Sequence, residues 1–421
     1  MGLTLTLLLA LPPGARAEQH FADASANVDR VLALADERMS LMPGVAAYKW
    51  QKKLPALDPE REKAVTAHAL DVAKTMGLAP EGVREVFDLQ VRAARESQVR
   101  LHDTWRAQGF DWSGPIPSLE TDIRPRLDRF TADFLRALYL AAPEFARADF
   151  TTTYVARIDT LRAAGWTDAE KHALLDALAK IRLLPADPGL SPAARIKNTG
   201  VIRVGTTGDY APFSIDRDGT LTGADIDLAE SLANRLHLSP VFIKTTWPTL
   251  LNDLGADKFD IAMGGVSITP ARAEVAAFST PYATGGKAIL ARCAETGRYP
   301  NLAAVDRRGV RVIVNPGGTN EQYVRENVKR AVVRIFPDNT RIFDEISANR
   351  ADVMITDDVE ADLQAKTHSD LCRVSRETLT RADKAILLPK NDDELKTQID
   401  GALNEAIQAG EPKRLLQQNL K

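Results

Sequence analysis

The strongest constraint on the fold is a change of sequence pattern near residue 185. Before it, apolar residues recur at helical spacing in segments with few glycines. After it, short β-rich runs alternate with helical segments. Residues 184–192 read Leu-Pro-Ala-Asp-Pro-Gly-Leu-Ser-Pro and break both patterns. We therefore predict an all-α domain over residues 18–184, a linker over 185–197 and an α/β domain over 198–421.

The expected elements follow from the same periodicities. In the first half we predict helices over residues 28–39, 60–76, 80–107, 125–140 and 168–181. In the second half we predict strands over residues 201–206, 240–244, 259–263, 288–291, 311–315, 332–336 and 353–356. Helices are expected between them over residues 225–236, 249–254, 270–276, 321–329 and 340–348. This βαβα order indicates an open α/β sheet that binds ligands at the carboxyl ends of its strands.

Length and charge narrow the function classes. A chain of 421 residues is too long for one ordinary core and agrees with two or three domains. A formal net charge of -3 argues against a nucleic-acid surface. The six histidines lack metal-ligand spacing, and no phosphate-binding Gly-rich motif occurs. We therefore predict no metal and no other cofactor.

The N-terminus resembles a secretion signal over residues 1–17. An apolar run is followed by Pro12 and Pro13 and by an A-x-A cleavage pattern at Ala15–Ala17. The run is too short to span a bilayer, and no other stretch is long and apolar enough. We expect a periplasmic protein without a membrane span; the alternative is that residues 1–17 form an apolar first helix.

The chain holds two cysteines, Cys293 and Cys372. An even number of cysteines in an exported chain suggests one disulfide. The alternative is two separate buried thiols.

In the helical half, several cations and amides fall on regular helical positions. Arg38 and Lys49 are eleven residues apart, so an unbroken helix would place both on one face, although Pro43-Gly44 lies between them. Other such positions are Arg61, Gln90, Ala94, Gln98 and Arg124. Taken singly, each cation is most simply a solvated surface residue.

The local context of these residues raises the alternative. Arg38, Val45–Trp50, Val86–Ala93 and Leu119–Asp128 occur in the order found in the secreted, gamma-class chorismate mutases, which this half resembles over about residues 25–180. The resemblance implies an all-α fold with the active site inside one subunit. It also implies roles for five residues: Arg38, Arg61 and Arg124 would hold the carboxylates of chorismate, and Lys49 and Gln98 would reach its ether oxygen.

These residue types suit the reaction. The rearrangement of chorismate to prephenate needs a dicarboxylate held in one shape, and guanidinium forks bind carboxylates while keeping their charge. Fixed donors stabilise the negative charge that develops on the ether oxygen. Two departures from the family stand out. Gln98 replaces the Glu of some members, so no acidic proton is needed there, and Ala94 replaces a common hydroxyl residue.

The α/β half contains sequence motifs that resemble those of a second family. Val204–Phe213, Phe259–Arg272 and Phe278–Tyr282 resemble the polar-amino-acid solute-binding proteins. That resemblance implies a two-lobed, periplasmic-binding-protein-like (type II) fold that closes on its ligand. Lobe one would comprise about residues 198–290 and 385–421, and lobe two about residues 295–382.

Within that family, the sequence motifs most resemble those of the periplasmic cyclohexadienyl (prephenate/arogenate) dehydratases. Five segments carry this resemblance: Gly205–Tyr210, Thr246–Pro248, Val314–Glu321, Phe336–Asn339 and Met354–Asp357. Cys293 and Cys372 also fall where those enzymes have cysteines. Asp358 departs from the small residue expected after Asp357.

Dehydration of prephenate expels hydroxide, a poor leaving group, so a general acid should protonate it. The residue predicted for this role is Glu321; the alternative is that it merely favours the first turn of its helix. Arg272, after the Thr269-Pro270 cap, would hold a substrate carboxylate, although it could be a surface residue in a simple cap. The remaining expected substrate contacts are Tyr210, Phe213, Trp247, Ser267, Lys287, Thr319 and Asp357.

The leading hypothesis is therefore a bifunctional enzyme of phenylalanine biosynthesis acting on chorismate, then on prephenate or arogenate. Its main rival is a mutase fused to a non-catalytic amino-acid-binding protein, and a sensory module is a third, less favoured hypothesis. Sequence leaves open the oligomeric state, a homo-oligomer included, and the preference between prephenate and arogenate.

Overall fold

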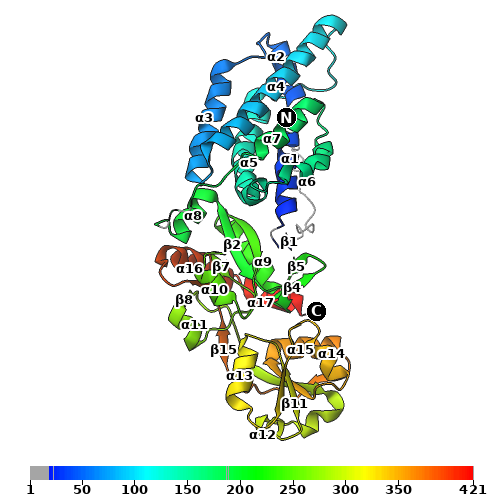
Figure 1. The fold of residues 1–421 in the computed structure, drawn as a ribbon, viewed down its shortest axis with the longest axis vertical. Coiled ribbons are helices and arrows are strands. Elements are labelled where there is room, and N and C mark those ends of the chain that lie inside the picture. The colour runs from blue at the N-terminus through cyan, green and yellow to red at the C-terminus, as the bar shows by residue number, and fades with distance from the viewer. Residues whose placement is uncertain (1–18, 22, 186, 188, 421) are drawn as a thin grey trace, which may run out of the picture. The chain divides into compact units, whose positions relative to one another are not determined.

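The computed structural model describes residues 19–21, 23–185, 187 and 189–420, so the predicted signal peptide lies outside the described residues. The chain forms two compact units. The helical unit comprises residues 22–202 with 237–239, and the α/β unit comprises the rest of the described chain. Each unit is coloured by sequence position in Figure 1.

The helical unit has the all-α fold expected from its periodicity. Its helices are α1 (Ala24–Ser40), α2 (Met42–Gln51), α3 (Pro59–Thr75), α4 (Pro80–Gln108), η1 (Leu119–Ile123), α5 (Arg124–Phe145), α6 (Phe150–Tyr154), η2 (Val155–Thr160), α7 (Asp168–Leu178) and α8 (Pro192–Thr199). Proline in the first turn opens α3, α4 and α8, where its missing N–H costs nothing. Thr167 and Glu170 form a capping box at the start of α7.

The core of this unit is built from the apolar stripes of its long helices. α1 packs along α5, and α4 packs against α2, α3 and α7. Phe87 and Phe134 meet edge to face with ring centroids 5.7 Å apart, in a core where both side chains are fully buried. This packing holds α1 to α5 so that polar side chains from these helices surround a single cavity.

The helix expected to carry both Arg38 and Lys49 is interrupted. α1 ends at Ser40 and α2 begins at Met42, with Pro43 in the first turn of α2. Because proline cannot donate the next backbone hydrogen bond, the chain starts a new helix here. The two cations therefore project from separate helices and not from one continuous face.

The α/β unit contains two five-stranded sheets, one in each lobe. The lobe-one sheet has the order β6 (Ser239–Lys244), β2 (Val201–Thr206), β7 (Ile261–Ala262), β16 (Leu387–Pro389), β8 (Ala276–Phe278). The lobe-two sheet has the order β12 (Val332–Ile335), β11 (Arg311–Val314), β13 (Val353–Asp357), β10 (Lys287–Arg292), β14 (Leu371–Arg373). β2 pairs with β7, and β11 pairs with β12 and β13, in parallel.

Helices and a smaller sheet complete this unit. The helical elements are α9 (Ala224–Arg235), α10 (Leu250–Gly255), α11 (Pro270–Val275), η3 (Cys293–Arg298), α12 (Leu302–Val305), α13 (Thr319–Asn327), α14 (Ile342–Ser347), α15 (Asp358–Thr367), α16 (Asp393–Gln408) and α17 (Glu411–Asn419). The smaller sheet has the order β1 (Gln19–His20), β5 (Thr220–Thr222), β4 (Ser214–Arg217), β3 (Asp209–Tyr210).

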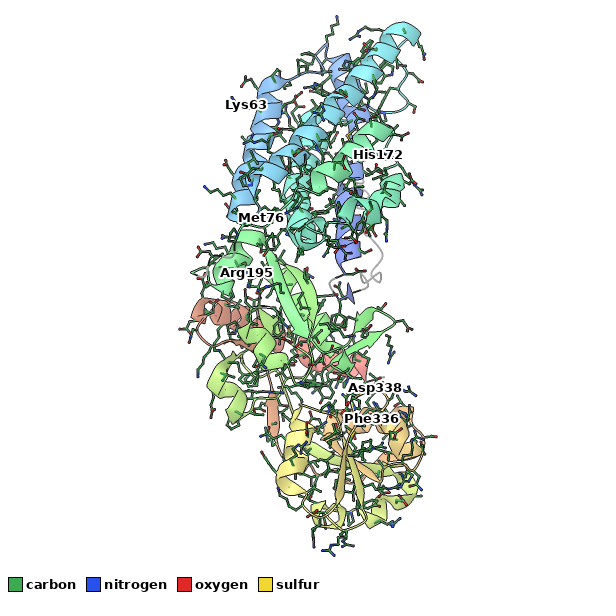
Figure 2. All side chains as sticks on the ribbon, in the orientation of Figure 1. Lys63, Met76, His172, Arg195, Phe336 and Asp338 are labelled. Carbon is green, nitrogen blue, oxygen red and sulfur yellow. A yellow bond between two sulfur atoms is a disulfide. The ribbon has the colours of Figure 1, made fainter. Side chains whose placement is uncertain are left out.

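Two antiparallel strands, β9 (Ala283–Gly285) and β15 (Ala382–Lys384), carry the chain between the lobes. The lobes are thus joined by paired crossovers, as expected for a two-lobed binding fold. Asn315 follows β11 directly, Asp357 ends β13, and the turn after β12 runs through Phe336 and Asp338, which are labelled in Figure 2. These polar loops lie at the carboxyl ends of parallel strands, where open α/β sheets bind ligands.

Three sequence boundaries differ from the structure. Strand β10 (287–292) pairs with β13 and β14, so lobe two begins near residue 287 and not near 295. Residues 192–197 of the predicted linker are helical, because the Ser191 side chain caps the first turn of α8. Gln19 and His20 pair with β5, so these two residues belong to the α/β unit.

Cys293 and Cys372, which are 79 positions apart in sequence, form a disulfide within lobe two. It ties the start of η3 to the edge strand β14. Among the described residues, no helix is both long and apolar enough to span a bilayer.

Candidate active sites

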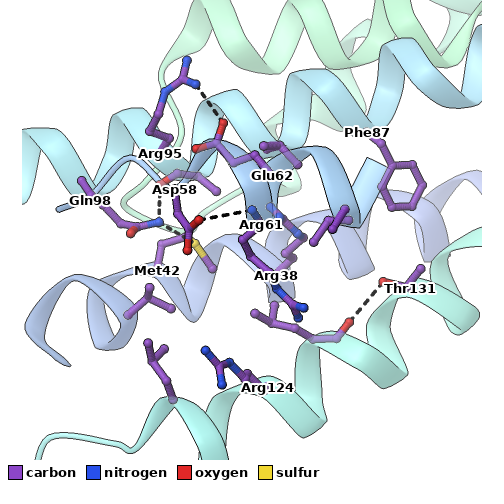
Figure 3. Close-up of a pocket in the computed structure, with 18 of the residues that line it drawn as sticks. Arg38, Met42, Asp58, Arg61, Glu62, Phe87, Arg95, Gln98, Arg124 and Thr131 are labelled. Atoms are coloured by element: carbon purple, nitrogen blue, oxygen red, sulfur yellow. Dashed lines mark hydrogen bonds and ion pairs between the residues drawn. The ribbon is translucent and has the colours of Figure 1, made fainter. Parts of the chain in front are cut away.

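A cavity of about 240 Å³ lies among α1 to α5 of the helical unit; we call it the helical-unit cavity (Figure 3). Every residue for which the resemblance predicts a role in the first reaction lines it: Arg38, Lys49, Arg61, Gln98 and Arg124. Arg95 also lines it, together with three carboxylates, Asp58, Glu62 and Asp128. Five cations against three carboxylates leave a surplus of two positive charges, which suits a dicarboxylate.

Arg38 is the cation of this cavity that stands out. Its guanidinium donates to the Gln90 carbonyl at 2.9 Å and lies 5.8 Å from the ring centre of Phe130. Among the described residues, no carboxylate lies within ion-pairing distance of it. Burial lowers the pKa of Arg38 to about 10, which still leaves it charged at neutral pH. A partly buried guanidinium without an anionic partner is a ready carboxylate site.

The other cations are held more loosely or by partial pairing. Lys49 donates to the Ala56 carbonyl at 2.7 Å, and burial lowers its pKa. Arg61 and Arg124 are exposed and reach Asp128 and Glu120 only at 3.8 and 3.7 Å. Such long contacts leave donors free for a ligand.

Gln98 occupies the buried side of the cavity. Its Nε2 donates to the Ala94 carbonyl at 3.0 Å, and its buried Oε1 has no partner among the described residues. Ala94 lines the cavity one turn before it, so the place of a hydroxyl group is taken by a methyl group. Arg95, which sequence reasoning missed, pairs with Glu62 at 2.9 Å and so presents less free charge.

The second candidate site lies between the lobes of the α/β unit; we call it the cleft. It has a volume of about 20 Å³. Its lining residues are Tyr210, Trp247, Gly265, Ser267, Arg272, Asn315, Gly318, Thr319, Asn320, Asn339, Asp357 and Lys384. Of the predicted substrate contacts, Phe213 and Lys287 lie just behind this lining, and Glu321 is outside it.

Arg272 is placed by its helix, as predicted. Thr269 accepts the Arg272 backbone N–H at the start of α11, and the guanidinium turns back to donate to the Ser267 carbonyl at 2.9 Å. It lies 5.9 Å from the Trp247 ring centre, and among the described residues no carboxylate pairs with it. Burial lowers its pKa to about 10, so it remains a cation ready for a substrate carboxylate.

The aromatic residues form one wall. Tyr210 and Trp247 meet edge to face at 5.8 Å, and Trp247 donates to Asp209 at 3.1 Å. Phe213 packs behind Tyr210 at 5.2 Å and does not line the cleft. In this structure Phe213 supports the Tyr210 ring, and its predicted contact with substrate stays a prediction.

Asp357 is the most heavily engaged group of the cleft. Its Oδ1 accepts from Lys287 at 2.6 Å, and its Oδ2 accepts from Tyr210 at 2.5 Å and from Lys384. Burial alone would raise the pKa of Asp357, but Lys384 and Lys287 hold it well below its usual range. Asp357 is therefore ionised and fully partnered.

Glu321 is not placed as a general acid requires. Its carboxylate accepts the Gly317 backbone N–H at 2.6 Å and pairs with Arg325. These contacts lower its pKa, so it is ionised at neutral pH. These contacts do not support the predicted acid role, which stays a prediction. Glu321 closes the Gly317–Gly318 turn, and the Gly317 N–H donates to it.

A carboxyl group with the opposite property lies deeper in the same lobe. Glu360, in the first turn of α15, is 1% exposed and accepts a hydrogen bond from the Thr356 hydroxyl. Burial raises its pKa to about 8, so it carries a proton at neutral pH. Asn320 connects it to the cleft, since its amide donates to Thr356 at 3.1 Å and its Oδ1 accepts from Lys287.

Sequence reasoning missed both Glu360 and Lys384. Glu360 stands three residues after Asp357 in a helix start, where acidic residues are common, and only burial sets it apart. Lys384 lies on the crossover strand β15, nearly thirty residues from Asp357 in sequence, and nothing local marks it.

Together, the geometry defines a two-lobed binding fold with a charged interlobe site, preceded by an all-α unit with its own cavity rich in cations. The family model for bacterial extracellular solute-binding proteins, family 3, matches residues 202–421, and that for type II chorismate mutases matches residues 26–99. The chain belongs to the family-3 solute-binding proteins and carries a chorismate mutase domain in front of that fold.

Individual similar proteins add detail to this family assignment. Cyclohexadienyl dehydratase of Pseudomonas aeruginosa is 44% identical over 243 residues, covering 56% of this chain and 90% of that protein. The L-cystine-binding protein TcyJ of Escherichia coli is 30% identical over 227 residues, covering 53% of this chain and 84% of that one. The crystal structure of the ancestral amino acid-binding protein AncCDT-1, a precursor of cyclohexadienyl dehydratase, matches with a TM-score of 0.52 and 34% identity, covering 55% of this chain and all of that one.

Proposed function

We propose that this protein converts chorismate to prephenate in the helical unit and prephenate to phenylpyruvate in the α/β unit. The similarity to a cyclohexadienyl dehydratase over 90% of that enzyme, behind a chorismate mutase domain, carries this proposal. The product of the first reaction is then the substrate of the second. We further propose that residues 1–17 direct export to the periplasm, in keeping with the extracellular family.

In the first reaction the protein forms no covalent bond with its substrate. Arg38, Arg61 and Arg124 would bind the two carboxylates of chorismate and hold it in the reactive chair. Lys49 and the Gln98 amide would donate to the ether oxygen as its bond to the ring breaks and negative charge develops there. Neither donor has to transfer a proton.

In the second reaction a proton must be supplied. The bond between the ring and its hydroxyl breaks as that oxygen takes a proton, and the ring carboxylate leaves as CO₂ while its bonding electrons complete the aromatic ring. The products are phenylpyruvate, water and CO₂. We propose Glu360 as the proton source, because burial raises its pKa to about 8 and it is hydrogen-bonded to Thr356 beside the cleft residue Asn320. The Thr356 hydroxyl would pass its own proton toward the substrate as it takes one from Glu360, since the Asn320 amide cannot relay a proton. Arg272 would hold a substrate carboxylate.

The same enzyme could act on arogenate, giving phenylalanine. The competing proposal is that the α/β unit only binds an amino acid, as the name of TcyJ implies for that relative. Prephenate supplied to the purified full chain separates the two. Formation of phenylpyruvate supports the dehydratase, whereas no turnover, together with a thermal shift on adding an amino acid, supports the binder.

A further inference from the structure

Among the described residues, Asp357 is the carboxylate that lines the cleft, and both of its oxygens already have partners. Asp357 has two oxygens, and Lys287, Lys384 and the Tyr210 hydroxyl occupy both of them. The side chains of Lys287 and Lys384 are only 7% and 3% exposed. An ammonium group arriving with a ligand would have to displace a buried lysine before it could reach Asp357.

The two lysines are themselves fixed by other partners. The Lys287 ammonium donates its three hydrogen bonds to Thr319 at 2.8 Å, Asn320 at 2.5 Å and Asp357 at 2.6 Å. Lys384 donates to Ser267 at 3.0 Å as well as to Asp357. Neither lysine can swing away without leaving buried polar groups unsatisfied, which is costly.

The charge balance of the cleft points the same way. Arg272 and Lys384 line the cleft and Lys287 lies just behind it, so these three cations face one carboxylate, Asp357, and the four groups together carry a surplus of two positive charges. A ligand with two carboxylates and no amine neutralises this surplus. A ligand that replaces its keto oxygen with an ammonium group brings one positive charge into a cationic site.

Building on the proposed function, we propose that Lys384 and Lys287 make the cleft selective for the keto-acid dianion, prephenate, against its amino analogue, arogenate. Asp357 acts as the anchor of the two lysines and not as an amine acceptor. Lys384, contributed by the crossover strand, is a specificity-determining residue of the site.

The test compares two substrates in the purified full chain. We expect kcat/KM to be at least about tenfold higher for prephenate than for arogenate, because discrimination between substrates appears in this ratio. A ratio near one, or one that favours arogenate, overturns the proposal. If neither substrate is consumed, that result contradicts the proposed dehydratase activity itself, and the proposed preference for prephenate with it.

Variants then assign the selectivity to the lysines. Lys384→Met removes one cation and frees one Asp357 oxygen, so the prephenate-to-arogenate ratio should fall by about tenfold or more. Lys287→Met is the independent second variant, with the same expected direction. Because both rates come from one enzyme sample, partial loss of folded protein leaves their ratio unchanged.

A matched control removes a lysine outside the cleft. Lys258 is exposed and pairs with Asp253 on lobe one, so Lys258→Met should keep the wild-type ratio. Both cleft variants keeping that ratio would also overturn the proposal, since Asp357 would then play no part in the choice of substrate.

Discussion

The helical-unit cavity and the cleft solve different chemical problems with similar charges. Cations outnumber carboxylates in the lining of both sites, as expected for sites that receive dicarboxylates. The cavity measures about 240 Å³ and presents Arg38 without an anionic partner. The cleft measures about 20 Å³, and its lysines are bound to Asp357.

This difference reflects what each reaction needs. A rearrangement inside one molecule needs a site that holds the substrate, and free guanidinium groups in a formed cavity provide it. An elimination needs a proton source kept away from water, and we propose the buried Glu360 for this role. We therefore expect activity at the helical-unit cavity to depend on fixed positive charges, and activity at the cleft to depend on a titrating acid.

The variant with the largest expected effect tests that acid. Glu360→Gln keeps the size and polarity of the side chain but removes its proton. We expect turnover of supplied prephenate to fall by about 10²- to 10⁴-fold. Mutase activity in the same sample should stay at the wild-type level. Glu321→Gln is the matched control and should change turnover by no more than about twofold; loss of activity in that variant alone would return the acid role to Glu321.

The reciprocal change breaks the other site. Arg38→Ala should lower kcat/KM for chorismate by about 10²- to 10³-fold, because it removes a partly buried cation that no carboxylate of the described residues neutralises. Phenylpyruvate formation from prephenate should be unaffected. Arg126 is an exposed arginine on α5 that pairs with Glu37, and Arg126→Ala should leave both activities intact. Equal losses in the two variants would refute a specific role for Arg38.

A pH profile sharpens the contrast without mutation. In the proposed role Glu360 acts in its protonated form, and burial raises its pKa to about 8. Dehydratase kcat should therefore be constant below that pH and fall about tenfold per unit above it. The mutase has an amide, Gln98, where some family members have an acid, so its rate should not follow the same curve. Superimposable profiles would show that one shared group limits both reactions.

The smallest effect probes a missing contact in the cavity. Ala94→Ser restores a hydroxyl group on the α4 face that lines the helical-unit cavity. One added hydrogen bond to the substrate should lower KM for chorismate by about two- to fivefold. Steady-state kinetics would reveal it, and an unchanged or higher KM would mean that the substrate does not reach this position.

Sequence patterns predicted what depends on local periodicity. The five helices predicted in the first half, the strand β2 and the start of α11 with its Thr269 cap fall where they were expected, whereas α2 and α6 were not predicted. The family resemblance also selected five residues that one cavity brings together, from Arg38 to Arg124. Local pattern placed most of these residues on helices, and the resemblance, not the pattern, singled them out.

Sequence failed where tertiary packing decides the chemistry. Glu321 and Glu360 both open helices, and no local signal tells which one will be buried and protonated. The structure pairs Glu321 with Arg325 and buries Glu360 beside Thr356, so their pKa values move in opposite directions. Lys384 reaches Asp357 only because the crossover strand returns to the lobe boundary.

The central claim is that one chain carries out two successive reactions at two separate sites. Purified full-length protein should be given chorismate while chorismate, prephenate and phenylpyruvate are followed together by NMR. The account predicts that prephenate rises and then falls, and that phenylpyruvate finally equals the chorismate consumed. Stoichiometric accumulation of prephenate with no phenylpyruvate would contradict it and leave the α/β unit as a binding protein.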